Sequence, residues 1–161
     1  MLHPTVEYEK NPELFADYRT PYKFNRPILA PSGVAGDFDA LGVDNMRIFR
    51  HRGRFYATYI GFDGVGYQTA LAVSDDLLNW KKLGVIFPRG SANTWDRVGR
   101  AVSCWLHDID LYGERELIAK DGNYWMFYHA YPDKGYEGRA AFISFVGIGR
   151  RRGSQWTRMD Q

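Results

Sequence analysis

The sequence has little cysteine, little excess charge and no long hydrophobic run. Its one cysteine, Cys104, has no partner for an internal disulfide, and the apolar run AVSCWL around it predicts a buried thiol in a reducing compartment. The net charge of +2 is too small to indicate a polyanionic partner, so we expect no nucleic acid. No run approaches the roughly 18 apolar residues of a membrane span, and no secretion signal is recognisable. We therefore expect a cytoplasmic protein with no membrane partner.

Aromatic residues and glycine are abundant instead. The chain has 11 Tyr, 10 Phe, 5 Trp and 17 Gly, which favours short strands and tight turns over helices. A length of 161 residues is enough for one core and too short for two. We predict a single all-β domain over residues 1–161. Histidine lacks the spacing of zinc ligands, so we expect no metal and no cofactor.

Alternating apolar and polar residues predict four antiparallel strands in the first half. The first two are MRIFRH and RFYATYIGF, joined by the hairpin HRGR, and the others are YQTALAVS and WKKLGVIF. The segment SDDLLNW predicts a tight turn that Ser74 and Asp75 cap, with Leu77 and Trp80 folded back onto the sheet. The segment RPILAPSG, with its two prolines, predicts an edge strand or an extended entry segment before this unit rather than a central strand.

A second unit repeats the first. Gly53 and Gly122 lie 69 residues apart (122 − 53), and each begins a Gly-x-aromatic-aromatic-x-x-Tyr pattern. The second unit would contain ERELIAKDGNYWMFYHAY, GRAAFISF and QWTRMD, with the arginines of residues 150–152 in a solvated loop. Two four-stranded units are typical of β-propeller blades. We predict antiparallel four-stranded blades of a partial propeller: an arm at 1–26, a first blade at 27–90 and a second blade at 100–158.

The order of motifs resembles a known superfamily. The segments are RPILAPSG, FDALGVDNMRI, GRFYATYIGFDG, TALAVSDDLLNW and DIDLYGERELIAKDGNYWMFYHAYP. Over about residues 25–145 they resemble the five-bladed β-propeller glycosidases of glycoside hydrolase families 43, 32 and 130, most closely family 130. The resemblance implies a carbohydrate ligand and cleavage by two carboxyl groups, with water or phosphate as the acceptor.

In these families a blade begins with Gly-Val-Glu-Asp-Pro-Arg-Ile, five residues before a turn glycine. The matching segment here is GVDNMRI, which places Asp44 at the family's Glu, Asn45 at its catalytic Asp and Arg47 at its Arg. An amide cannot donate a proton as a carboxylic acid does, so the phosphorylase mechanism does not carry over unchanged at Asn45. In the looser register of family 43, Asp44 resembles the general base. The alternative is that Asp44 only caps its own turn.

The second unit offers candidates for the general acid. Glu114 stands eight residues before Gly122, as the acid of family 43 does before its turn glycine. Asp110 and Glu116 are near competitors for the same catalytic role. Because the innermost strand of each blade lines the channel, acids at the start of successive blades would face one pocket. The alternative is that Glu114 and Glu116 form a solvated pair before a strand.

Other residues are candidates for binding the ligand and for setting the protonation states of the two carboxyl groups. Arg47 or Arg100 would keep Asp44 ionised, while Trp105, Tyr112 and Trp125 would wall Glu114 and favour its protonated form. His107 and His129 would partner nearby acids or aromatic rings. Aromatic side chains would form a stacking platform for sugar faces, with a core role as the alternative. These aromatic candidates are Tyr59, Trp95, Tyr128 and Tyr131.

A closed five-bladed propeller needs about twenty strands, more than this chain provides. We therefore expect either a homo-oligomer that covers the exposed sheet edges or a chain that corresponds to part of a longer protein. Three functions follow from the residues and the resemblance. They are a glycoside-cleaving enzyme, a carbohydrate-binding module without catalysis, and a self-assembling structural protein.

Overall fold

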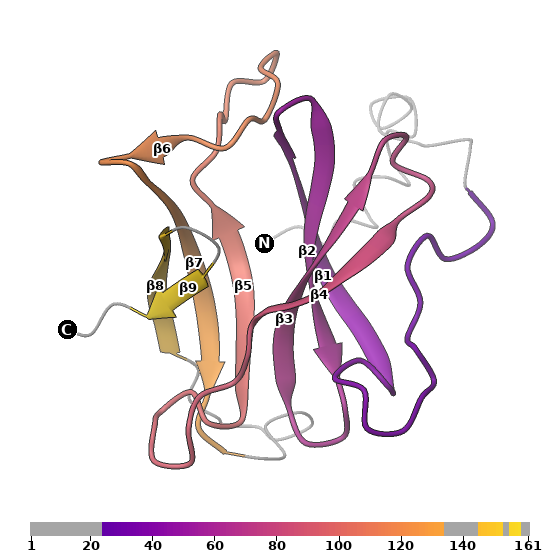
Figure 1. The fold of residues 1–161 in the computed structure, drawn as a ribbon, viewed down its shortest axis with the longest axis vertical. Helices are drawn as coiled ribbons and strands as arrows, with labels where there is room; N and C mark the ends of the chain where they lie inside the picture. The colour runs from indigo at the N-terminus through magenta and orange to yellow at the C-terminus, as the bar shows by residue number, and fades with distance from the viewer. Residues whose placement is uncertain (1–23, 134–144, 153–154, 159–161) are drawn as a thin grey trace, which may run out of the picture.

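The structure is a computed structural model that describes residues 24–133, 145–152 and 155–158. These residues form strands, turns and loops without any helix, so the all-β prediction is confirmed. The strands make two antiparallel sheets that lie side by side (Figure 1). Most of the predicted arm, residues 1–23, lies outside the described residues. No segment of the described chain forms a helix that could cross a membrane.

The first sheet contains the four strands that alternation predicts. They are β1 (Gly42–His51), β2 (Arg54–Phe62), β3 (Tyr67–Ser74) and β4 (Lys81–Phe87), in that spatial order. The predicted hairpin joins β1 to β2 through Arg52 and Gly53, which have φ values of 51° and 76°. Two successive residues with positive φ are the mark of a tight turn that matches the twist of the strands.

The segment RPILAPSG forms no strand, so the edge strand, one of its two predicted forms, is wrong. Its prolines have no N–H to give to a ladder, and Leu29 instead covers the first sheet. There Leu29, Phe38 and Trp80 pack around the buried Tyr59. The segment is therefore a cover over one face of the blade.

The turn between β3 and β4 is capped by Ser74 and Asp76. The Ser74 hydroxyl accepts the Leu77 N–H at 2.9 Å, and the Asp76 carboxylate accepts the Asn79 N–H at 2.7 Å. The prediction that Ser74 caps this turn is confirmed. The prediction that Asp75 caps it is wrong, because the Asp75 carboxylate pairs with Arg54 at 2.6 Å. Leu77 is exposed and does not fold back onto the sheet.

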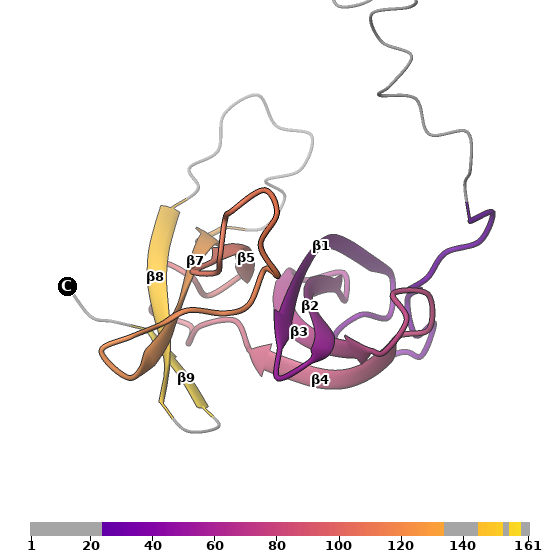
Figure 2. The same cartoon turned by 90° about the horizontal axis from the view of Figure 1, so that it is seen from above.

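The second sheet departs from the predicted strands. It contains β5 (Gly99–Trp105), β6 (Ala119–Lys120), β7 (Asn123–Tyr131), β8 (Phe145–Arg152) and β9 (Gln155–Arg158), with the order β5-β7-β8-β9 and β6 beside β7. The strand beside the first sheet is β5, which carries the AVSCW run (Figure 2). The ERELIA segment was expected in this place but belongs to the β5–β6 connection, residues 106–118. The arginines of residues 150–152 lie in β8 rather than in a loop. The predicted strand GRAAFISF covers residues 138–145, and all of it except Phe145 lies outside the described residues.

The β5–β6 connection pairs with itself and with the edge of β1. Within it, the Asp108 N–H donates to the Glu116 carbonyl at 2.9 Å. On β1, Arg50 donates its N–H to the Arg115 carbonyl at 3.0 Å and accepts the Leu117 N–H at 3.2 Å. Residues 114–118 of the ERELIA segment therefore bond their backbone groups away from β7, which explains why the segment is not the inner strand.

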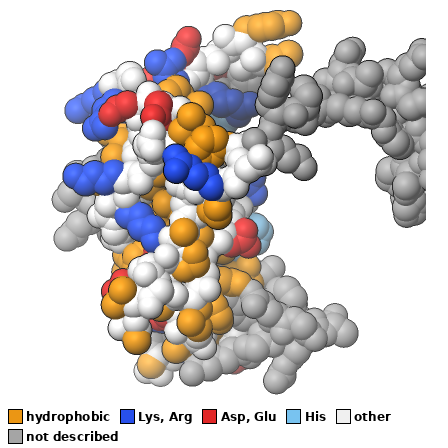
Figure 3. Space-filling view, turned by 90° about the vertical axis from the view of Figure 1, so that its right-hand side faces the viewer, with side chains coloured by type: hydrophobic (Ala, Val, Ile, Leu, Met, Phe, Trp, Pro, Cys, Tyr) orange, Lys and Arg blue, Asp and Glu red, His pale blue; other side chains and the backbone are white. Residues whose placement is uncertain are grey.

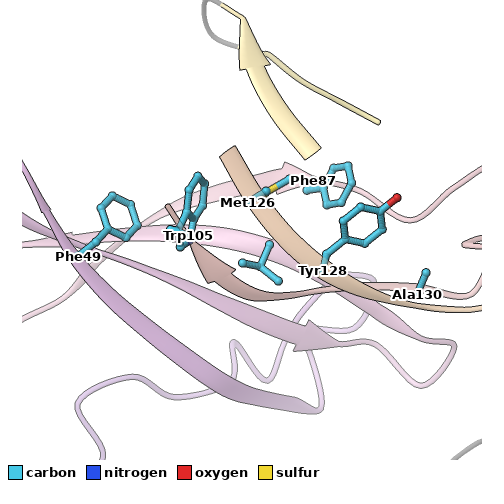
Figure 4. Packing of buried hydrophobic residues seen from close by; sticks show 7 residues of the cluster. Phe49, Phe87, Trp105, Met126, Tyr128 and Ala130 are labelled. Atoms are coloured by element: carbon cyan, nitrogen blue, oxygen red, sulfur yellow. The ribbon is translucent and has the colours of Figure 1, made fainter. Parts of the chain in front are cut away.

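The main core lies between the two sheets (Figure 4). Alternate residues of β7 turn one face toward it, namely Met126, Tyr128 and Ala130. Phe49 of β1 meets Trp105 of β5 with ring centroids 5.1 Å apart. This packing holds β1 and β5 next to each other at the junction of the blades.

Polar side chains also join the sheets across this junction. The Thr69 hydroxyl on β3 donates to the Arg100 carbonyl at 2.9 Å and accepts the Val102 N–H at 3.1 Å. The Trp105 indole N–H donates to the Thr58 hydroxyl at 3.1 Å. Because these groups are buried, each bond satisfies a donor or acceptor that water cannot reach. They fix the register of β5 against the first sheet.

Candidate functional site

A cleft of about 680 Å³ lies where β1, β5 and the β5–β6 connection meet. We call it the β1–β5 cleft. Arg47 and Arg50 line it from β1, Trp105 from β5, and Glu114 and Arg115 from the connection. Its volume falls within the roughly 300–1,000 Å³ of small-molecule sites. The cleft is therefore large enough for a short oligosaccharide.

Glu114 is held in the cleft by an ion pair with Arg50. The Glu114 side chain is 68% exposed and that of Arg50 is 32% exposed, so the pair lies at the rim. The Arg50 guanidinium also lies over the Phe55 ring, 5.5 Å from its centroid. Since the Arg50 backbone pairs with the connection as well, this arginine positions both the backbone and the carboxylate of the segment that bears Glu114.

Asp44 lies on β1 but does not line the cleft. Its exposed carboxylate accepts the N–H of Asn45 at 2.6 Å. Asn45 has a φ of 51°, and the β1–β2 register shifts between Asp44 and Arg47, which marks a β-bulge. Asp44 thus makes the local cap that we expected as the alternative, and its part in catalysis stays a prediction.

Asn45 uses its side chain as a structural tie. Its amide Nδ2 donates to the carbonyl of Val102 on β5 at 2.8 Å. This is the position that the resemblance to family 130 would fill with a catalytic Asp. An ionised carboxylate has no hydrogen to donate there, so the amide suits the contact that the two innermost strands make.

Asp110 and Glu116 lie away from the lining of the cleft. The exposed carboxylate of Asp110 accepts the Tyr112 N–H at 2.8 Å within the tip of the connection. Tyr112 itself is 92% exposed, so it does not wall Glu114 as expected. The tip turns on itself through these local bonds and points its side chains outward.

Arg100 is not the partner of Asp44. Its Nε donates to the buried Asp96 carboxylate at 2.6 Å, and its NH1 donates to the Pro88 carbonyl at 2.8 Å. Its guanidinium also lies 4.6 Å from the Phe87 ring centroid. A buried carboxylate needs a charged partner more than an exposed one does, which explains the choice of Asp96 over Asp44.

The expected stacking platform is wrong for two of its three tyrosines, while Tyr131 is half-buried. Tyr59 is 1% exposed and Tyr128 is 0% exposed, so both belong to the core. Burial, together with the nearby Asp39 carboxylate, raises the pKa of Tyr59 well above its ordinary range. Trp95 is partly buried and stacks on Tyr128 with centroids 5.9 Å apart. Tyr59 on β2 and Tyr128 on β7 are buried because each is the largest apolar side chain on the inward face of its strand.

The two histidines differ in position. His107 lines the cleft, with its Nδ1 2.7 Å from the Asp108 carbonyl oxygen. His129 is half-buried on β7 and is not part of the lining. Among the described residues, no group of His, Cys, Asp and Glu is arranged to hold a metal ion.

Cys104 and Trp105 are neighbours on β5, but only Trp105 is buried. Cys104 is exposed and lines the cleft, so the prediction of a buried thiol is wrong. The β5–β7 register shifts between Val102 and Cys104, and this bulge moves Trp105 rather than Cys104 to the inner face. Sequence reasoning could not place the bulge, because the AVSCWL run is apolar on both faces.

The fold and the cleft together define a class of protein: two propeller blades with a cleft at their junction. No protein-family model matches the sequence, and no curated protein matches it. Solved structures do match, and they include glycoside hydrolases with a propeller-type fold.

One match is a BT0996 RGII complex, with 29% identity and a TM-score of 0.71 over 95% of the present sequence. Another is a glycoside hydrolase with 28% identity and a TM-score of 0.71 over 100% of the present sequence. A glycosyl hydrolase from Bacteroides ovatus, with 17% identity and a TM-score of 0.56 over 84% of the present sequence, shows the fold alone. The present protein spans 44%, 46% and 35% of the length of these three proteins, less than half of each.

Proposed function

We propose that the chain is a glycoside hydrolase-like protein that binds a short oligosaccharide in the β1–β5 cleft. The observation that carries this proposal is the cleft itself, at the junction of the innermost strands of two blades. Its Phe55 offers aromatic surface for a sugar ring, and its arginines offer hydrogen-bond donors for hydroxyl groups. The likeness to solved glycoside hydrolases at 28–29% identity supports the same function.

Glycoside cleavage needs two carboxyl groups on either side of one sugar. We propose Glu114 as the carboxylate that acts inside the cleft, and Asp44 as the second group. To act as an acid, Glu114 would have to leave its ion pair with Arg50. Of the families that the sequence resembles, family 43 fits better than family 130, because the Asn45 amide is engaged with Val102. We therefore favour water over phosphate as the acceptor.

The test combines sugar binding with turnover. Calorimetry against a panel of oligosaccharides would measure binding, and release of the phenol from aryl glycosides would measure cleavage. Glu114→Gln should abolish turnover while binding persists, because the amide keeps the shape of the side chain without its proton chemistry. Glu116→Gln is the matched control and should keep full turnover. Full turnover of Glu114→Gln would reject its role, and an absence of sugar binding would reject the proposal.

A second candidate is carbohydrate binding without cleavage. It is favoured by the Arg50–Glu114 pair, which occupies the one carboxylate among the described residues of the cleft lining. This candidate predicts sugar binding by calorimetry with no release of phenol, with or without phosphate.

We also propose that a second copy covers an exposed sheet edge. In the described part of the chain β4 pairs only with β3, and its Leu83 and Val85 are exposed. An open apolar edge of this kind favours pairing with another strand. Light scattering should give a mass above that of one chain, and a strictly monomeric mass would reject this proposal.

A further inference from the structure

We infer that the β1–β5 cleft selects a sugar that carries a carboxylate, as a uronic acid does; this rests on the proposed function. The cleft is lined by three arginines, namely Arg47, Arg50 and Arg115, and by one carboxylate, that of Glu114. A neutral oligosaccharide would leave this excess of positive charge uncompensated. An acidic one would compensate it.

Only one of the three arginines makes an ion pair within the described part of the protein. Arg50 pairs with Glu114 and lies over Phe55. Neither Arg47 nor Arg115 makes an ion pair or a side-chain hydrogen bond with any residue that the structure describes. Two guanidinium groups therefore remain open to a ligand, each with several donors in a planar fork that matches a carboxylate.

The two open arginines reach the cleft from different elements. Arg47 lies on β1, two residues before the buried Phe49. Arg115 lies on the β5–β6 connection, where its carbonyl accepts the Arg50 N–H at 3.0 Å and so ties this backbone to the edge of β1. The attachment points of both guanidiniums are thus fixed by the fold, although their side chains are exposed.

The lining also distinguishes a sugar acid from a small free anion. Phe55 contributes aromatic surface, and the volume of about 680 Å³ far exceeds that of an inorganic ion. A uronic acid combines a flat apolar ring face for Phe55 with a carboxylate for the arginines.

Charge is not concentrated in this way everywhere on the molecule. On the face seen from the side of the first sheet, Lys and Arg side chains are spread among hydrophobic ones (Figure 3). The positive charge that favours an anionic ligand is therefore that of the arginines in the cleft lining, and not the net charge of +2 of the chain.

The test uses a panel of uronic-acid disaccharides and their methyl esters, which keep the ring and lose the charge. Calorimetry on the full chain should show about tenfold tighter binding of an acid than of its ester, the effect of one charge-assisted hydrogen bond. Arg47→Gln and Arg115→Gln should each weaken binding of the acid more than binding of the ester, and so remove most of this difference. Lys120→Gln removes the same charge from an exposed site outside the cleft and should change neither affinity. Thermal melting confirms that each variant is folded.

The other outcomes separate this inference from the proposed function. Equal binding of acid and ester, or binding of neutral oligosaccharides alone, overturns the acidic-sugar inference and leaves the proposed function standing. Tighter acid binding that survives both arginine substitutions also overturns it. Sodium acetate that competes as well as the disaccharide acid would indicate an anion site without sugar recognition and overturn it too. If no sugar of either kind binds, both the inference and the proposed function fall.

Discussion

Asn45 of β1 donates its side-chain amide to the backbone carbonyl of Val102 of β5, and the two atoms are 2.8 Å apart. The bond joins the innermost strands of the two blades beside the β1–β5 cleft. It depends on the positive φ of 51° at Asn45, a conformation that asparagine tolerates better than most residues. A residue at a position that the family resemblance associates with catalysis is thus part of the scaffold.

Replacing this amide by a carboxylate should destabilise the protein. Asn45→Asp removes the donor and sets a negative charge against the Val102 carbonyl oxygen. We expect a loss of about 1–3 kcal/mol in the free energy of unfolding at pH 7, measured by urea denaturation. Asp44→Asn, one residue away on the exposed side, is the control and should change stability little. Equal stability of Asn45→Asp and the native chain would contradict the structural role.

The Thr69 hydroxyl should matter more than its methyl group. Thr69→Val keeps the shape but leaves the Arg100 carbonyl and the Val102 N–H without their buried partner. We expect a cost of about 1–3 kcal/mol in the free energy of unfolding. Thr69→Ser retains the hydroxyl and should recover most of this loss in the same denaturation experiment. A serine variant as unstable as the valine variant would show that the hydrogen bonds are not the cause.

Gly66 has no room for a side chain. A Cβ at this position would lie 1.7 Å from the carbonyl oxygen of Val98. Gly66→Ala should therefore force a backbone shift and cost about 3 kcal/mol. Gly42→Ala is the matched control, because its Cβ would meet the Phe62 Cβ at an ordinary 3.7 Å. Thermal melting should show a large drop for the first variant and a small one for the second, and similar values would contradict the close approach.

Asp63 should contribute to the loss of stability in acid. Burial alone would raise the pKa of Asp63, but hydrogen bonds from Arg89 and from the N–H groups of Val65 and Gly66 outweigh it and lower the pKa below 3.8. A lowered carboxylate pKa stabilises the fold above the unfolded value of about 3.8 and ceases to do so as the pH falls through the folded value. Asp63→Asn should lower the melting temperature at pH 7 and reduce its decrease between pH 5 and pH 3.

Asp37→Asn is the control for this titration, since Asp37 is exposed and its side chain makes no ion pair with a described residue. Its melting profile should follow that of the native chain from pH 7 to pH 3. An unchanged acid profile in Asp63→Asn would show that other carboxylates determine the loss.

Local patterns were enough to predict the strands of the first sheet and its hairpin. Alternation over residues 42–87 marks the four strands, although the central strands β2 and β3 are buried on both faces, and Gly53 supplies the positive φ that the turn requires. The same logic recovered β7 and the turn at Gly122, because these features depend only on neighbours along the chain. The limits of the domain and its blades stay a prediction.

The tertiary structure decided where the chemistry lies. The AVSCWL run forms the inner strand β5, whereas the ERELIA segment, where we expected the second unit to begin, lies mainly in the β5–β6 connection. Only the pairing of β5 with β7 and of the connection with Arg50 shows this. A bulge in β5 exposed Cys104, and packing between the sheets buried Tyr59 and Tyr128. Side-chain type and spacing determine which strands form, but the side that each residue faces depends on register shifts and on partners far away in the sequence.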